Sequence, residues 1–218
     1  MSRSIRLEYP GALYHVTARG VQQAAIFVDD RDRISLLTIA AQMLRICHAQ
    51  AFSFCLMGNH YHLVLQTRKA NLSVLMRRIN SLYSLAFNRR HDRRGHVFEG
   101  RFKALHVDCD AYLLEVCRYV DLNPVRAGLV EFPEQWRWSS YRVHAGFMPP
   151  LPWLATAELH GALMGQTPQH AEQTATAHRR YADWVDAGRG VQLWKNCLRH
   201  GLYLGDESFV ERIERLAT

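Results

Sequence analysis

The chain alternates between strand-like and helix-like stretches, and this order restricts the folds open to it. Stretches rich in aromatic and β-branched residues predict four strands, at 12–19, 51–57, 60–66 and, with a weaker pattern, 103–107. Apolar residues at helical spacing predict three helices, at 30–49, 71–90 and 110–123. The first six elements follow the order βαββαβ. We therefore expect an α+β ferredoxin-like fold, with an antiparallel sheet, helices on one face and an additional helix after the last strand.

The composition is that of a globular protein. Of 218 residues, 48% are hydrophobic and 22% are charged. No apolar run approaches the roughly 20 residues that span a bilayer, and the first residues lack the apolar segment of a secretory signal. Five cysteines, an odd number without a C-x-x-C pair, argue against a disulfide framework and a thiolate zinc site. We expect a cytoplasmic protein with no membrane partner.

The positive charge is unevenly distributed. The net charge is +7, and residues 1–150 carry 20 Lys and Arg against 12 Asp and Glu, whereas residues 151–218 carry 7 against 8. A basic first part favours a polyanionic partner. The alternative is charge that serves solubility alone.

Two histidines in the predicted strand at 60–66 form a candidate metal site. His60 and His62 are two residues apart, so in a strand both side chains point to the same face. Neutral imidazole is a common ligand of divalent cations. The pair is also compatible with two of the chain's twelve histidines lying on a half-exposed sheet face.

The predicted helix at 110–123 places a phenol and an amide together. Tyr119 and Asn123 are four residues apart and are therefore neighbours on a helix surface. Pro124 disfavours helix at position 123, which puts the amide of Asn123 near a helix end. Taken singly, each residue is also an ordinary helix residue.

Several separated motifs resemble one known family. "MGNHYHLVLQ", "VFEGRFKA" and "YLLEVCRYVDLNPVRAGLV" occur in the order found in the REP-associated tyrosine transposases, single-tyrosine members of the HUH endonuclease superfamily. The opening "YHVTARGVQQAAIFVDDRDR" fits too, and the resemblance covers roughly residues 5–145. Many relatives have Pro-Asn-His or Pro-Glu-His before the pair, whereas this chain has Gly58-Asn59-His60. That departure leaves the histidines themselves unchanged.

The resemblance implies a role for each residue. His60 and His62 become metal ligands with Asn123 as the third, and Tyr119 becomes the nucleophile. Tyr112, on the same helix, lies about 10 Å further from Asn123 by helix rise and is the rival. The ligand set admits Mg²⁺ or Mn²⁺. The implied reaction cleaves single-stranded DNA carrying a hairpin, through a 5′-phosphotyrosine that leaves a free 3′-OH and allows strand transfer.

A basic stretch at 88–103, with six basic and two acidic residues, is the expected DNA-binding segment. His96, Phe98 and Phe102 could stack on unpaired bases. The residues expected to contact DNA are Arg77, Arg78, Arg89, Arg90, Arg93, Arg94, His96, Arg101, Lys103 and Arg126. Solvated surface charge is the alternative for each of them.

Prolines in "FMPPLPWL" mark a linker. We expect a catalytic domain over 1–147, the linker over 148–154 and a mostly helical extension of unknown role over 155–218. Two other functions stay open: a non-catalytic single-stranded nucleic-acid-binding protein of ferredoxin-like fold, and a metal-dependent hydrolase that uses water. A domesticated transposase, and a monomer or a homodimer, are equally compatible with the sequence.

Overall fold

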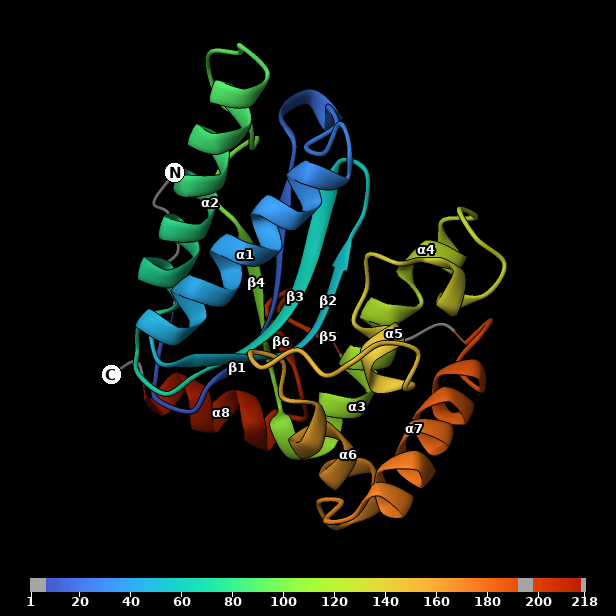
Figure 1. Ribbon diagram of the computed structural model, residues 1–218. Coiled ribbons are helices and arrows are strands. Elements are labelled where there is room, and N and C mark those ends of the chain that lie inside the picture. Colours follow the sequence, from blue (N-terminus) through green and yellow to red (C-terminus); the bar gives the residue numbers. More distant parts are fainter. Residues whose placement is uncertain (1–6, 192–197, 217–218) are drawn as a thin grey trace.

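The computed structural model describes residues 7–191 and 198–216 (Figure 1). Its first part contains the elements that the sequence predicts. The strands are β1 (Leu13–Arg19), β2 (Ala49–Leu56), β3 (His60–Thr67) and β4 (Lys103–Val107). The helices are α1 (Asp30–Ile46), α2 (Leu72–Arg90) and α3 (Cys109–Asp121). A single 3₁₀ turn, η1 (Val21–Gln23), follows β1.

The sheet has the strand order β2-β3-β1-β4-β6-β5. Its first four strands pair antiparallel, as the ferredoxin-like arrangement requires, so the predicted fold class is confirmed. β1 lies in the middle, between β3 and β4. In the β1–β3 register, Thr17 lies opposite His62 and Arg19 lies opposite His60. The histidine pair is therefore held on an interior strand of the sheet.

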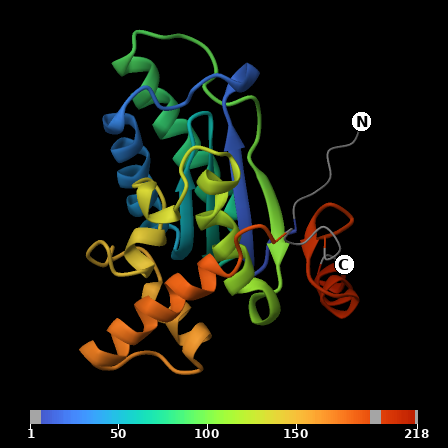
Figure 2. The ribbon, with the colours of Figure 1, turned by 90° about the vertical axis from the view of Figure 1, so that its right-hand side faces the viewer.

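Each face of the sheet carries its own apolar core. Side chains alternate between faces along a strand, so neighbours such as Leu13 and Tyr14 enter different cores. α1 and α2 cover one face and bury residues such as Leu36 and Leu75 there. α3 covers the other face through Val116 and its apolar neighbours. The views in Figures 1 and 2 show the sheet between these two layers.

The chain bends where α3 ends. A four-residue helix, α4 (Asn123–Arg126), follows directly, with Pro124 in its first turn. Proline is tolerated there because the first turn of a helix does not need its N–H groups for internal hydrogen bonds. Asn123 thus lies at a junction between two helices, as the prediction from Pro124 expected.

The rest of the chain packs mostly on the α3 face. A 3₁₀ turn η2 (Pro133–Gln135) and the helix α5 (Tyr141–His144) lead to α6 (Thr156–Met164) and α7 (Ala171–Asp186). The chain then adds β5 (Leu198–Arg199), β6 (Tyr203–Leu204) and α8 (Glu207–Arg215). Residues 192–197 and 217–218 of the expected extension lie outside the described residues.

The strands β5 and β6 were not predicted from the sequence. Each has only two residues, too few to show the alternation that identifies a strand. β6 pairs parallel with the end of β4, with Tyr203 opposite His106, so the extension contributes to the same sheet. Among the described residues, no helix combines the length and the apolar character that a membrane span needs.

Candidate active site

A cavity of about 330 Å³ opens where β1, β3 and the start of β4 meet the end of α3. It is lined by Thr17, Ala18, Arg19, His60, His62, Glu99, Gly100, Arg101, Lys103, Tyr119 and Asn123. All four residues for which the sequence predicts a metal-binding or nucleophilic role line this one cavity. The fold therefore brings together two histidines and a tyrosine–asparagine pair that are more than fifty residues apart in the chain.

The two histidines differ in their surroundings. Their ring centroids are 5.0 Å apart, and Nδ1 of His60 is hydrogen-bonded to Oδ1 of Asn59 at 2.7 Å. His62 is 7% exposed, and its Nε2 is buried without a hydrogen-bond partner among the described residues. A buried ring nitrogen without a partner is unfavourable unless a ligand occupies that position. Nε2 of His62 thus fits a metal ligand.

Burial keeps both imidazoles neutral. It lowers the pKa of His60, and the positive charge of Arg19 lowers it further. Burial also lowers the pKa of His62 well below its ordinary value, with additional contributions from His15, His60 and Arg19. A neutral imidazole has a free nitrogen lone pair, which is the form that binds a cation.

His15 on β1 contacts His62 and was missed by the sequence analysis. Its Nε2 lies 2.9 Å from Nδ1 of His62. Burial lowers the pKa of His15 to about 4, so this ring is also neutral at physiological pH. The sequence places His15 on the same face of its strand as Thr17, and Thr17 lies opposite His62 in the sheet. That proximity to His62 could be predicted only by knowing that β1 pairs with β3.

Tyr119 and Asn123 reach the cavity from the end of α3. The ring of Tyr119 lies edge-on to His15 and His62, with centroid separations of 5.9 Å and 6.3 Å. Nδ2 of Asn123 donates to the carbonyl of Tyr119 at 2.9 Å. That bond holds the amide nitrogen against the helix and leaves Oδ1, a suitable metal ligand, without a hydrogen bond among the described residues. The guanidinium of Arg126 lies 4.8 Å from the Tyr119 ring centroid in a cation–π contact.

Tyr112, the rival nucleophile, does not line the cavity. Both tyrosines pack partly against the apolar core between α3 and the sheet, and of the two only Tyr119 lines the cavity. Tyr119 as the nucleophile stays a prediction, and its place in the cavity wall is compatible with that role.

A buried polar network fixes the helix that carries Tyr119 and Asn123. Asp121 is fully buried and lies on the side of α3 opposite to Tyr119 and Asn123. Its Oδ1 accepts hydrogen bonds from Ser140 at 2.7 Å and from Ser53 at 3.4 Å, and its Oδ2 accepts one from Tyr181 at 2.7 Å. The carboxyl group thereby connects α3 to β2, to the residue preceding α5, and to α7. Burial raises the pKa of Asp121 to about 7, against the effect of these hydrogen bonds.

The predicted DNA-binding residues fall into separate groups. Arg101 and Lys103 line the cavity, and Arg126 lies over Tyr119. Arg19, which the sequence analysis did not select, adds another positive charge to the cavity wall. The remaining exposed members lie on α2 and on the loop that follows it: Arg77, Arg78, Arg89, Arg93, Arg94 and His96.

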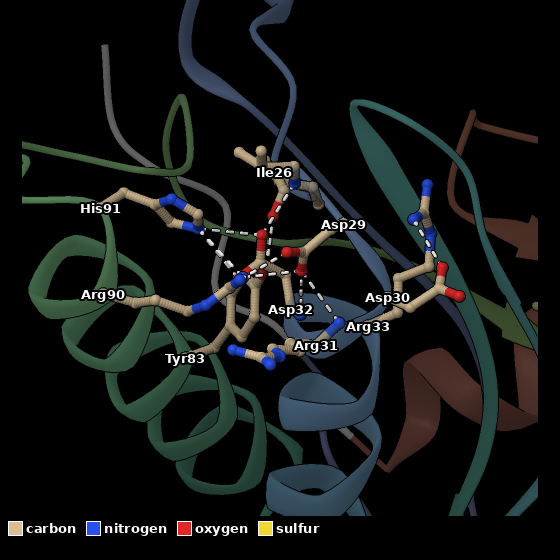
Figure 3. Close-up of polar contacts among 10 residues, drawn as sticks. Ile26, Asp29, Asp30, Arg31, Asp32, Arg33, Tyr83, Arg90 and His91 are labelled. Atoms are coloured by element: carbon tan, nitrogen blue, oxygen red, sulfur yellow. Dashed lines mark hydrogen bonds and ion pairs between the residues drawn. The ribbon is translucent and has the colours of Figure 1, made fainter.

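Arg90 differs from these residues because it binds two aspartates of the protein. Its Nη1 donates to Asp32 Oδ1 at 2.6 Å and to Asp29 Oδ1 at 2.7 Å, and His91 Nε2 lies 3.0 Å from Asp32 (Figure 3). Asp32 is buried at the start of α1, so Arg90 neutralises a carboxylate and connects α2 to α1. Arg90 is exposed, but its charge is paired with the carboxylates of Asp29 and Asp32 and is less available to a DNA phosphate.

The prediction that Phe98 and Phe102 stack on bases is wrong. They are 8% and 5% exposed and belong to the core under α1 and α2. The ring of Phe98 lies edge-on to Tyr61, at a centroid distance of 6.0 Å. Both phenylalanines therefore anchor the basic loop to the core.

Comparison with known proteins identifies the family of this chain. A family model described as "Transposase IS200 like" matches residues 9–123, which is more than half of the chain. The chain belongs to this family. The match ends at Asn123 and includes His60, His62 and Tyr119. The resemblance drawn from the sequence motifs is thereby confirmed, as is a transposase-like DNA-processing function at the level of the family.

Solved structures support the fold. A REP-associated tyrosine transposase bound to a REP hairpin is 17% identical with a TM-score of 0.58, covering 71% of this chain and 92% of that one. A tRNA(His) guanylyltransferase from Saccharomyces cerevisiae is 11% identical with a TM-score of 0.34, covering 79% and 86%. At that TM-score it carries no argument about this chain. No curated protein matches the sequence.

Proposed function

We propose that this protein is a metal-dependent endonuclease and strand transferase for single-stranded, hairpin-forming DNA. The observation that carries the proposal is that His60, His62, Asn123 and Tyr119 line one cavity. Two imidazoles, an amide oxygen and a phenol are what a tyrosine-based phosphodiester transfer needs in one place.

The metal would be held by His60, by Nε2 of His62 and by Oδ1 of Asn123. Two observations support this set: among the described residues, neither Nε2 of His62 nor Oδ1 of Asn123 has a hydrogen-bond partner. These nitrogen and oxygen donors, without thiolate, suit Mn²⁺ or Mg²⁺. When bound, the ion would stabilise the negative charge that develops on the oxygens of the scissile phosphate.

Tyr119 would supply the nucleophile. Its phenol proton would pass to solvent, and the phenol oxygen would then attack the phosphorus; the Oη–P bond forms while the bond from phosphorus to the 3′ oxygen breaks. The products are a 5′-phosphotyrosine and a strand whose 3′ oxygen takes up a proton to become a hydroxyl. The bond energy is retained, so a second 3′-OH can attack the phosphotyrosine and rejoin the strand. The cation–π contact with Arg126 holds the ring in place for this step.

DNA would approach over the basic side of the cavity. Arg101 and Lys103, which line the cavity, would bind phosphates next to the scissile bond. The exposed basic residues on α2 and the loop after it would extend this positive surface: Arg77, Arg78, Arg89, Arg93, Arg94 and His96. The hairpin bound to the structurally similar REP-associated transposase supports a hairpin substrate for this chain.

The test is a covalent-capture assay. Purified protein is incubated with labelled single-stranded oligonucleotides that contain hairpins, with Mn²⁺, and resolved on a denaturing gel. We expect a protein-linked DNA band that disappears in Tyr119→Phe and with chelator, and that persists in the matched control Tyr112→Phe. Cleavage that persists in Tyr119→Phe would indicate activated water. Binding without cleavage, both with Mn²⁺ and in a repeat with Mg²⁺, would favour the non-catalytic binding protein.

A further inference from the structure

We infer that His15 is a positioning residue for the metal site, because it sets which nitrogen of His62 carries the proton. The inference rests on the proposed function, since it assumes that Nε2 of His62 is the metal-binding atom. It begins from the contact between the two rings, where His15 Nε2 lies 2.9 Å from His62 Nδ1.

The geometry is that of an in-plane hydrogen bond. The two rings are within 7° of parallel, and their centroids are 5.2 Å apart. Face-to-face stacking would not bring one edge nitrogen of each ring to 2.9 Å at that centroid separation. The rings therefore meet edge to edge in nearly one plane, with each nitrogen on the lone-pair axis of the other.

Only one distribution of protons is compatible with metal binding. A neutral imidazole carries one N–H, so a His62 that binds a cation through Nε2 has its proton on Nδ1. That N–H must donate, and His15 Nε2 must accept. If His15 carried its proton on Nε2, Nδ1 of His62 would become the acceptor and Nε2 of His62 would be protonated and unable to bind.

The position of His15 maintains this arrangement. Its side chain is 5% exposed, so the ring is enclosed in the position from which Nε2 meets Nδ1 of His62. Its backbone lies in the middle of β1, opposite Val64 on β3 and Leu105 on β4. This pairing on both sides fixes the backbone from which the ring projects toward His62. Because it is also edge-on to Tyr119 at 5.9 Å, the same ring supports the phenol beside the ligand.

Two substitutions separate hydrogen bonding from space filling. His15→Phe fills the site but cannot accept a hydrogen bond, whereas His15→Gln can accept through Oε1 near the position of Nε2. Loss of such an outer partner typically lowers metal affinity about 10–100-fold. We expect that loss in His15→Phe and a largely restored affinity in His15→Gln. His106→Phe is the matched control, because His106 is also a buried histidine in the sheet, on β4, and makes no hydrogen bond to His62 among the described residues.

The experiment has two readouts, neither of which is activity. Mn²⁺ binding to DNA-free protein is measured by electron paramagnetic resonance, and the His62 tautomer by ¹⁵N NMR of the metal-free protein. We expect the proton on Nδ1 in the wild type and a shift of tautomer in His15→Phe. A folded His15→Phe with unchanged Mn²⁺ affinity and an unchanged tautomer would overturn the inference.

The tautomer measurement keeps the two proposals distinguishable. If the wild type binds no Mn²⁺, the proposed metal site fails, while the tautomer of metal-free His62 still tests the role of His15. If His15→Phe does not fold, the wild-type tautomer decides alone: a proton on Nε2 of His62 overturns the inference.

Discussion

Removing the hydroxyl of Tyr181 should destabilise the protein by an amount that depends on pH. That hydroxyl donates to Oδ2 of Asp121 at 2.7 Å, and both residues are fully buried. Because burial raises the pKa of Asp121 to about 7, its carboxyl is mostly ionised near pH 8.5 and mostly protonated near pH 5.5. Tyr181→Phe therefore removes a charge-assisted hydrogen bond at the higher pH and a neutral one at the lower pH.

The two kinds of hydrogen bond differ in strength. A hydrogen bond to a charged group contributes about 1.5–3 kcal/mol to stability, and a neutral one contributes about 0.5–1.5 kcal/mol. We expect Tyr181→Phe to lower the free energy of unfolding by about 2 kcal/mol near pH 8.5 and about 1 kcal/mol near pH 5.5. For a chain of this size the melting temperature should then fall by about 4–8 °C and about 2–4 °C, respectively.

Urea unfolding followed by circular dichroism at both pH values measures these losses. Tyr141→Phe is the control, because Tyr141 is a neighbouring buried tyrosine whose hydroxyl makes no hydrogen bond to Asp121 among the described residues. Tyr141→Phe should change the free energy of unfolding only slightly, and by the same amount at both pH values. Equal losses for Tyr181→Phe at both pH values, or a loss below about 0.5 kcal/mol at each, would refute this account of the network.

Further predictions concern other contacts. The folded pKa of Asp121 exceeds its unfolded value, so its stabilising contribution is full below about pH 4 and is lost as pH rises to about 7; Asp121→Asn should flatten that slope in urea titrations at successive pH values. Arg90→Met should destabilise by about 2 kcal/mol, because the buried Asp32 loses a charged hydrogen bond while His91 remains beside it; thermal unfolding checks this, and a change in DNA affinity alone would contradict it. Phe98→Ala should lower stability by about 3–5 kcal/mol, measured by urea unfolding. Lys103→Ala should weaken DNA binding and reduce the salt slope by about one unit in a titration at several salt concentrations.

Local geometry grouped the candidate residues in pairs, and the resemblance to a known family gave each of them its role. His60 and His62 share a face because a strand repeats every two residues, and Tyr119 neighbours Asn123 because a helix brings every fourth residue together. The order of strands and helices was sufficient for the ferredoxin-like class, and Pro124 was sufficient for the helix junction at Asn123. These properties depend on residues close together in the chain, so no knowledge of the tertiary structure was needed.

Only the tertiary structure decided which side chains meet. His15 reaches His62 because β1 pairs with β3 in one particular register. Phe98 looked like part of a DNA-binding loop, yet that loop turns its ring into the core. Arg90 lies in a basic stretch of the sequence and was therefore expected to contact DNA phosphates. In the structure it binds Asp32, on a helix some sixty residues earlier. Pairing between distant segments depends on the shape and burial of the whole core, which local periodicity does not contain.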